Sequence, residues 1–235
     1  VLLTFLIMVF WSFFEQAGSS LTLFAEKNVN LTFLNAAQTQ SINPFYIMAL
    51  AIPFSYMWTL LDKKKLNPPT PVKSAMGLAQ LGLGFFIFAY SARYMDASGK
   101  VPFIFLALGY LLLTTGELFM SPIGLSKVTE LSPAKIVAFM LGVYYLSSSF
   151  AHYIAGAIAK LTTKTSSTDG SGIMDKWVHF VTGFKPEEAS NAVENVQSLM
   201  TYTGVFAQIA LVSLGVAVLA LLLSPLIKKL MHGIH

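Results

Sequence analysis

The sequence contains no cysteine, and only 11% of its residues are charged. Without cysteine the chain has no disulfide, no thiol nucleophile and no thiolate ligand for a metal. It also lacks a glycine-rich phosphate-binding loop, a dinucleotide-binding glycine motif, a nucleophile elbow and a paired-histidine metal site. A soluble domain carries roughly twice this charged fraction, so the composition excludes an ordinary soluble protein. We therefore expect no enzyme, no metal site and no organic cofactor.

Long hydrophobic runs are what the chain has in abundance. Hydrophobic residues make up 55% of the sequence, and the mean hydropathy is +0.66. Runs such as 2–14 and 205–223 approach or match the roughly 20 residues that cross the hydrocarbon core of a bilayer. We predict an all-α membrane protein with six transmembrane helices, at about residues 2–25, 42–61, 72–94, 101–123, 134–161 and 199–227. Val1 stands inside a hydrophobic run without an initiator methionine, so we expect a longer polypeptide.

Basic residues are spread unevenly over the connections between these segments. The net charge of +4 is modest and unclustered, so we expect no nucleic-acid partner. The second and fourth connections and the C-terminal tail carry most of the lysines, namely Lys63, Lys64, Lys65, Lys73, Lys127, Lys135, Lys228 and Lys229. The other short connections carry only Lys27, Arg93 and Lys100. The positive-inside rule therefore predicts a multi-pass protein of the cell inner (cytoplasmic) membrane whose lysine-rich connections and C-terminus are cytoplasmic.

The fifth connection, residues 162–198, differs from the others because it is long and polar. It opens with a stretch rich in threonine, serine and glycine. After Pro186, Glu187 and Glu188 suit the N-terminus of a short helix. We predict an external loop that elaborates the surface.

Two carboxylates, Glu15 and Glu117, lie inside hydrophobic runs. An ionised carboxylate at the centre of a membrane helix is disfavoured by roughly 3 kcal/mol, so each should face a cavity or partner, or be protonated part of the time. Polar residues at steps of three or four predict a stripe along the first helix, formed by Ser12, Glu15, Ser19, Thr22 and Glu26. We favour a cavity over a serine-rich packing interface, because packing explains the serines and not Glu15.

Ser121 lies four residues after Glu117 and shares its helix face. Pro122 and Gly124 follow and are expected to weaken or bend the helix. Bent helices at membrane depth mark binding sites in transporters, although a proline kink also serves packing alone. Asn43, next to a proline at the start of the second segment, either offers its carbonyl to a cation or caps the helix, and capping is the simpler interpretation.

The fifth segment places Tyr145, Ser148, Ser149 and His152 near one face. Aromatic rings with hydroxyls suit the wall of a pocket, and core packing explains the rings equally well. No second histidine or acid lies at metal-ligand spacing from His152. We interpret His152 as an interhelical hydrogen-bond partner rather than a proton relay.

Four stretches resemble segments of the proton-dependent oligopeptide transporter (POT/PTR) family of the major facilitator superfamily. Its seventh-helix signature is similar to Phe10-Trp-Ser-Phe-Phe-Glu-Gln-Ala-Gly-Ser-Ser-Leu-Thr-Leu-Phe-Ala25. Its tenth-helix signature is similar to Gly116-Glu-Leu-Phe-Met-Ser-Pro-Ile-Gly-Leu-Ser-Lys-Val-Thr-Glu-Leu-Ser-Pro133. Gln40-Ser-Ile-Asn-Pro44 and Pro69-Thr-Pro-Val-Lys73 also look like family segments. The resemblance implies that residues 1–235 form the C-terminal six-helix bundle of a twelve-helix transporter for dipeptides and tripeptides, with the proton as coupling ion.

The resemblance also implies roles for individual residues. Glu117 is similar to the acid that receives the amino terminus of the peptide, and Asn43 to the residue that assists it. Ser121 resembles a serine that helps to line the pocket. Glu15 is similar to the acid that couples proton movement to transport and forms a salt bridge with an arginine of the family's first helix.

Around the fifth segment the chain departs from the family pattern. Tyr144 stands where the family commonly has tryptophan, and we predict that Tyr145 and Ser148 line the substrate pocket with it. Ala151-His152 replaces the usual Gly-Asn pair. The family's groups for the peptide carboxylate belong to the N-terminal half, so the implied partners are that half, the peptide and the lipid bilayer. Alternatives are a transporter of another solute or drug, or a non-transporting membrane sensor, which has no need of two midplane acids.

Overall fold

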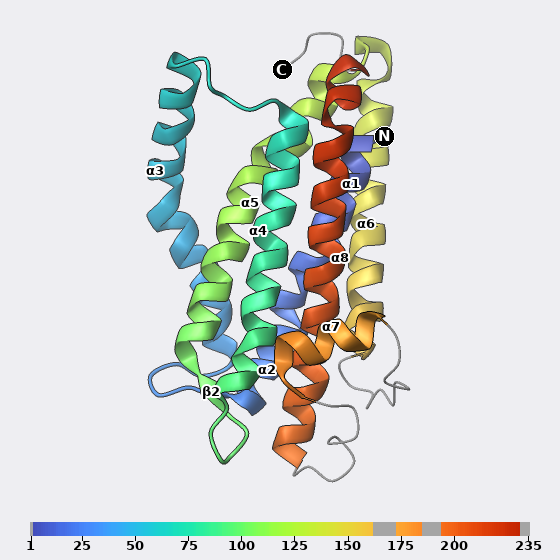
Figure 1. The fold of residues 1–235 in the computed structure, drawn as a ribbon. Helices are drawn as coiled ribbons and strands as arrows, with labels where there is room; N and C mark the ends of the chain where they lie inside the picture. Colours follow the sequence, from blue (N-terminus) through green and yellow to red (C-terminus); the bar gives the residue numbers. More distant parts are fainter. Residues whose placement is uncertain (1, 162–172, 185–193, 231–235) are drawn as a thin grey trace.

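Long apolar helices run side by side through most of the structure, a computed structural model that describes residues 2–161, 173–184 and 194–230 (Figure 1). The elements in chain order are α1 (Leu2–Phe14), η1 (Glu15–Gly18), α2 (Ser20–Asn28), β1 (Val29–Asn30), η2 (Ala37–Ser41), α3 (Ile42–Lys63), α4 (Thr70–Tyr90), η3 (Ser91–Tyr94), β2 (Val101–Pro102), α5 (Phe103–Leu131), η4 (Ala134–Ile136), α6 (Val137–Leu161), α7 (Ile173–Thr182) and α8 (Glu194–Leu230). The two short strands pair in parallel, with Val29 opposite Val101.

The described residues include 5 helical stretches that are long and apolar enough to cross a membrane, and these are Ala37–Lys63, Thr70–Tyr94, Phe103–Glu130, Ala134–Leu161 and Glu194–Lys229. The first predicted segment, residues 2–25, is different. It is divided into α1, the 3-10 turn η1 and α2, so the prediction of one regular helix there is wrong. Hydropathy identifies apolar residues but does not detect a local change of helical geometry.

Other bounds also differ from the predicted segments. Helix α5 continues to Leu131 rather than ending at residue 123, and α8 begins at Glu194 rather than at residue 199. The additional residues in both helices include polar ones, because a helix that crosses a membrane can continue beyond its apolar stretch into water. The predicted loop 162–198 contains α7, whose Trp177 Nε1 donates to Ala207 O at 2.7 Å. The short helix predicted after Pro186 lies outside the described residues.

Connections rich in lysine lie together at one end of the bundle (Figure 1). The start of α1, the α3–α4 connection, the α5–α6 connection and the end of α8 share this end, and the β1–β2 pair lies at the other. This is the arrangement that the distribution of lysines predicts, with the basic connections on one side of the membrane.

At the opposite end, Asp96 organises the turn between η3 and β2. Its carboxylate accepts hydrogen bonds from the Ser98 hydroxyl at 2.6 Å, from Asn30 Nδ2 at 3.0 Å and from the Lys100 backbone N–H at 3.0 Å. These bonds, those from Ser98 and Asn30 first, hold the pKa of Asp96 well below its usual range. Because the pKa of Asp96 is depressed in the folded chain, its contribution to stability is fully present above the ordinary aspartate pKa. That contribution is lost only as the pH falls into strong acid. Near neutral pH the charge of Asp96 is therefore constant.

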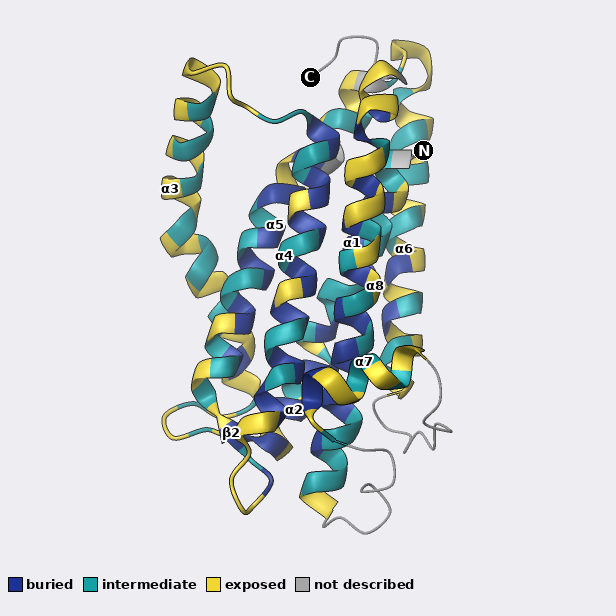
Figure 2. Cartoon of the chain, viewed as in Figure 1, coloured by how far each residue is buried: buried dark blue, intermediate teal, exposed yellow. Residues whose placement is uncertain are grey.

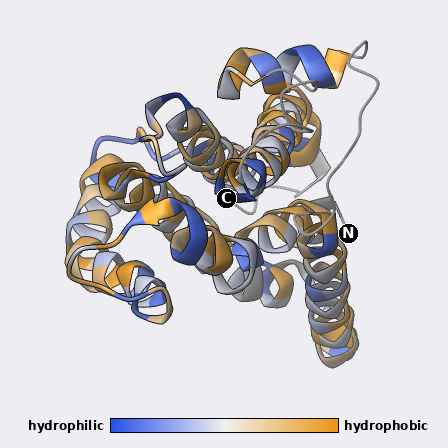
Figure 3. Ribbon diagram, turned by 90° about the horizontal axis from the view of Figure 1, so that it is seen from below, coloured by the Kyte–Doolittle hydropathy of each residue, from blue (hydrophilic) through white to orange (hydrophobic). Residues whose placement is uncertain are grey.

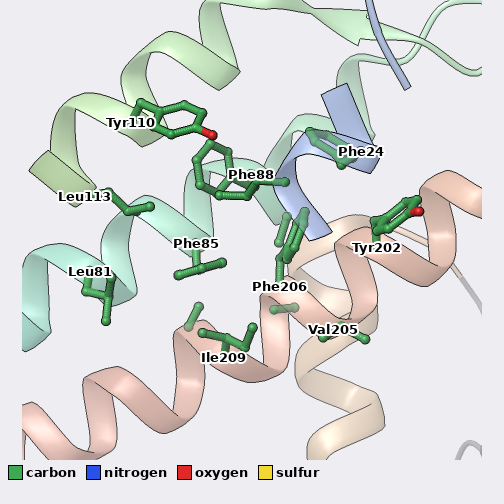
Figure 4. Close-up of a cluster of buried hydrophobic side chains, with 14 of the residues drawn as sticks. Phe24, Leu81, Phe85, Phe88, Tyr110, Leu113, Tyr202, Val205, Phe206 and Ile209 are labelled. Atoms are coloured by element: carbon green, nitrogen blue, oxygen red, sulfur yellow. The ribbon is translucent and has the colours of Figure 1, made fainter. Parts of the chain in front are cut away.

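The core lies where α1, α2, α4, α5 and α8 meet, and Figure 4 shows part of it. The Phe206 ring of α8 packs against three buried rings, with centroid distances of 5.4 Å to Phe24, 5.7 Å to Phe85 and 5.9 Å to Phe88. Lipid tails are as apolar as these side chains, so close van der Waals packing rather than removal from water favours this association inside a membrane. The packed rings hold α2, α4 and α8 together next to the polar residues of the bundle.

Glycines bring α4 and α5 into backbone contact next to Glu117. A Cβ added at Gly116 would lie 2.9 Å from the carbonyl oxygen of Gly77, and one added at Gly77 would lie 3.0 Å from that of Gly116. The Thr115 hydroxyl also donates to Gln80 Oε1 across the same helix pair. This small-residue contact fixes the position of α5, and so of Glu117, against α4.

We expect Gly116→Ala in the full-length protein to lower the free energy of unfolding by about 1–3 kcal/mol, because the methyl group meets a backbone oxygen and the two helices must separate. The matched control is Gly142→Ala on α6, where an added Cβ meets nothing within 4 Å and the higher helix propensity of alanine acts alone. Thermal unfolding in detergent measures both. Equal midpoints for the two variants would contradict the close α4–α5 contact.

Helices α3 and α6 are the least buried of the long helices (Figure 2). No residue of α3 is buried, and α6 buries only Ala151 and Ala155. Seen along the helices, apolar residues lie around the circumference of the bundle as well as inside it (Figure 3). On α3 the exposed apolar side chains recur at steps of three or four, at Phe45, Met48, Ile52 and Tyr56. Such a face suits lipid or another membrane domain.

Candidate functional site

The break between α1 and α2 positions the first acid. Glu15 is the first residue of η1, and Gln16 beside it is fully buried. Gln16 Nε2 donates to Ala155 O on α6 at 3.0 Å, while Gln16 Oε1 accepts from the Ser20 hydroxyl at 2.7 Å. Gln16 thus holds the 3-10 turn against α6, and Glu15 is presented from an irregular segment between two helices.

The polar stripe predicted along this segment does not form a continuous face. Ser12 is buried and donates to Met8 O at 2.7 Å, and Ser19 lies outside both regular helices with φ −129° and ψ −90°. The 3-10 turn changes the rotation per residue, so positions that share a face in a regular α-helix separate here. Glu15 itself remains partly exposed, with 35% of its side chain accessible.

A cavity of about 200 Å³ opens beside this turn. Its lining comes from α1, η1, η2, α3 and α5 and consists of Phe14, Glu15, Ala17, Gly18, Gln40, Asn43, Pro44 and Tyr110. The Tyr110 hydroxyl donates to Ala17 O at 3.4 Å, which ties α5 to the turn. Apolar walls with a few converging polar groups are typical of a small-molecule binding site.

The second acid is joined to this cavity through Asn43, whose Nδ2 donates to Glu117 Oε2 at 2.9 Å. The capping interpretation of Asn43 is wrong: α3 begins at Ile42, and the residue at its N-cap, Ser41, makes no side-chain capping bond. The helix starts before Pro44, so the Asn43 amide is free to reach α5. The Glu117 carboxylate also lies near enough to Glu15 for the two charges to repel.

The remaining predicted site residues do not line this cavity: Ser121 and Tyr145 are exposed, and Tyr144 and Ser148 are half-buried. Ser121 is exposed on α5, one turn beyond Glu117, and does not line the cavity. Tyr144, Tyr145 and Ser148 lie on α6, and none of them lines it either. The Tyr144 and Tyr145 rings pack edge to face at 5.5 Å, and Tyr145 is 59% exposed. Helix α5 is continuous through Pro122, so the weakened helix expected there is not broken.

The structure adds site residues that sequence reasoning missed. These are Gln16, Gln40 and Tyr110, which hold or line the cavity. His152, interpreted from the sequence as an interhelical hydrogen-bond partner, lies across from Glu15 with its Nδ1 3.7 Å from Glu15 Oε2. Tyr110 is seven residues before Glu117, so helical periodicity places it on the same face and was a usable signal. Nothing in the spacing of His152 identifies its contact, because η1 and α6 meet only in the folded bundle.

Among the described residues, no three His, Asp or Glu side chains gather as metal ligands. The fold and these contacts define a class: a multi-pass membrane protein in which one acidic side chain lines a cavity between the helices and a second is hydrogen-bonded to Asn43 of the same lining.

Residues 1–177 match the sequence profile of the POT family. Dipeptide and tripeptide permease B of Shigella dysenteriae serotype 1 (strain Sd197) is 30% identical over 228 residues, which cover 95% of this chain and 42% of the permease. The crystal structure of a peptide transporter POT in complex with sulfate superposes with a TM-score of 0.75 at 28% identity, over 98% of this chain and 40% of that one. A POT family transporter in complex with a thioalcohol-conjugated peptide superposes at 0.72 and 25% identity, over 96% and 40%.

The chain belongs to the POT family, and it spans about two fifths of the length of these relatives. The predicted fold class, an all-α membrane bundle of the major facilitator type, is confirmed, and so is the family resemblance read from the motifs.

Proposed function

We propose that this chain is the C-terminal six-helix half of a proton-coupled symporter for dipeptides and tripeptides. The observation that supports this best is the connection of two acids through one cavity: Glu15 and Asn43 line it, and Asn43 is bonded to Glu117. Similarity to a dipeptide and tripeptide permease supports the substrate class. The protein is then a carrier and no enzyme, and its coupling ion is the proton, with no other cofactor.

Glu117 is proposed to bind the ammonium group of the peptide. A carboxylate that meets an ammonium in a low-dielectric site forms a charge-assisted bond about twice as strong as a neutral one. Asn43 orients that carboxylate from α3 through its 2.9 Å hydrogen bond. The roles of Ser121, Tyr144, Tyr145 and Ser148 as pocket residues stay predictions that belong to this proposal.

We expect Asn43→Ala to weaken peptide binding roughly fivefold, the equivalent of about 1 kcal/mol, because its bond to the Glu117 carboxylate holds that group in place for the peptide. The matched control is Asn67→Ala, whose amide donates to Asp62 in an exposed connection at 3.3 Å. Calorimetric titration of the full-length protein with dialanine measures both variants. Unchanged affinity in Asn43→Ala would show that this bond does not position Glu117.

Glu15 is proposed as the proton-coupling acid. It protrudes from a turn rather than from a regular helix, and part of its side chain is accessible beside the cavity. Protonation would release it from a cation of the other half and allow the two halves to rock about the site. One charge that crosses about 100 mV gains about 2.3 kcal/mol, which corresponds to roughly fiftyfold accumulation of a neutral substrate.

The partner half would cover the exposed apolar faces of α3 and α6, while lipid covers the rest. These two helices stand at opposite edges of the bundle in Figure 1, with the elements that carry Glu15 and Glu117 between them. A second bundle that bridges α3 and α6 would therefore close over both acids. The lysine-rich end and the C-terminus face the cytoplasm in this proposal.

The test is uptake of labelled dialanine by liposomes that contain the full-length protein, with an inward proton gradient. Accumulation that a protonophore abolishes is expected. Uptake of another solute that excess dialanine does not inhibit would indicate a different cargo. Dialanine binding without any uptake would indicate a non-transporting sensor.

A further inference from the structure

The imidazole of His152 lies opposite the proposed proton-coupling acid. His152 Nδ1 is 3.7 Å from Glu15 Oε2, between α6 and the 3-10 turn η1. The side chains are 59% and 35% exposed, so the pair lies at the open surface beside the cavity rather than in the core. We propose that His152 is a positioning residue for proton coupling, which holds the Glu15 carboxylate toward α6 when the imidazole is protonated. This inference rests on the proposed function and extends it.

The geometry of the turn makes this contact specific. Gln16, next to Glu15, donates to Ala155 O at 3.0 Å, and Ala155 is one helical turn beyond His152. Gln16 and Ala155 are both buried, so this bond fixes the register between η1 and α6. His152 and Glu15 therefore face each other as a consequence of a buried interhelical bond and not through a chance meeting of two flexible side chains.

Few other charges act on the pair from the described elements. Helix α1 carries no charged side chain, α2 carries Glu26 and Lys27 near its C-terminal end, and the charges of α8 lie near its two ends. On α5 the nearest acid is Glu117, which interacts electrostatically with Glu15. Helix α6 itself adds Lys160 two turns away and the phenols of Tyr144, Tyr145 and Tyr153. The imidazole is therefore the cationic partner that the described chain places within ion-pair distance of Glu15.

Two protonation events then control one contact. An imidazole ordinarily changes charge between about pH 5 and 8. Protonated His152 attracts the Glu15 carboxylate, and either loss of that proton or protonation of Glu15 removes the attraction. A cation favours the ionised form of a neighbouring carboxylate, so removal of the imidazole charge is expected to slow proton release to the cytoplasm. Uptake without His152 should therefore require a higher pH.

The experiment compares dialanine uptake against pH for the full-length protein and three variants in liposomes. His152→Asn keeps a polar side chain without a charge, and His152→Lys keeps a permanent cation. His179→Asn, on α7, is the matched control because it makes the same substitution at an exposed histidine away from the site. We expect the uptake curve of His152→Asn to shift to higher pH by about half a unit, which is the size of shift that an exposed ion pair supports. The uptake curve of His152→Lys should shift to lower pH. The curve of the His179→Asn control should coincide with that of the parent.

Counterflow exchange without a proton gradient separates coupling from structure. His152→Asn should exchange peptide at the parental rate, since Glu117 and the cavity are intact. A His152→Asn curve that superimposes on the parental curve overturns the inference, and so does a variant that loses counterflow in proportion to uptake without a change in pH dependence. If the parent itself shows no proton-driven uptake, the proposed function fails, and this inference fails with it. Parental uptake that depends on Glu15 but not on His152 overturns the inference alone.

Discussion

Glu117→Gln in the full-length protein is expected to weaken dialanine binding by roughly 10- to 150-fold, the equivalent of about 1.5–3 kcal/mol for a hydrogen bond to a charged group. Glutamine keeps the shape and one carbonyl oxygen, so the Asn43 amide retains an acceptor and the local packing is preserved. What is lost is the negative charge that the peptide ammonium meets. Calorimetric titration measures the change directly.

The matched control is Glu130→Gln on the same helix. Glu130 is an exposed acid near the C-terminal end of α5, paired with Lys127 at 2.6 Å, and a pair with one exposed partner contributes little. Its removal should leave peptide affinity within about twofold. A second measurement uses an N-acetylated dipeptide, which the parent should bind poorly. Equal affinity of the parent for peptides with and without a free amino terminus would refute the role of Glu117.

Glu15→Gln is expected to abolish proton-driven accumulation, so that the ratio of internal to external dialanine falls from roughly fiftyfold toward one. The substitution removes the titratable group, while the buried bond from Gln16 to Ala155 still holds the turn. Substrate can therefore still exchange across the membrane. Filter assays of uptake and of counterflow on the same liposomes measure both quantities.

Retained counterflow distinguishes this outcome from misfolding. Loss of counterflow together with uptake would mean that Glu15 supports the structure rather than coupling. Full accumulation by Glu15→Gln would remove Glu15 from the proton pathway altogether.

Much of the chemistry was predictable from local sequence. An acid inside an apolar run is recognisable without a structure, and this identified both Glu15 and Glu117. The family motifs predict that Asn43 and Glu117 belong to one site. In the structure Asn43 Nδ2 lies 2.9 Å from Glu117 Oε2. The backbone of this segment was not predicted: the helical spacing of its polar residues from Ser12 to Glu26 suggests one regular helix, whereas Glu15–Gly18 form a 3-10 turn.

What could not be predicted depends on which helices are neighbours. The close contact of Gly77 with Gly116 requires α4 and α5 to be adjacent, and single-chain periodicity does not reveal that pairing. The contact of His152 with Glu15 likewise joins residues from opposite parts of the chain. Tyr145, one of the predicted pocket residues on α6, is exposed, and we propose that the N-terminal half covers this surface.

The most direct test of the whole account is the pH inside liposomes when dialanine is added outside. The full-length protein is reconstituted with a trapped pH-sensitive dye and no imposed gradient. We predict that dialanine acidifies the lumen, that N-acetylated dialanine does not, and that Glu15→Gln abolishes the signal. Entry of labelled dialanine without acidification would contradict proton-coupled transport through this site.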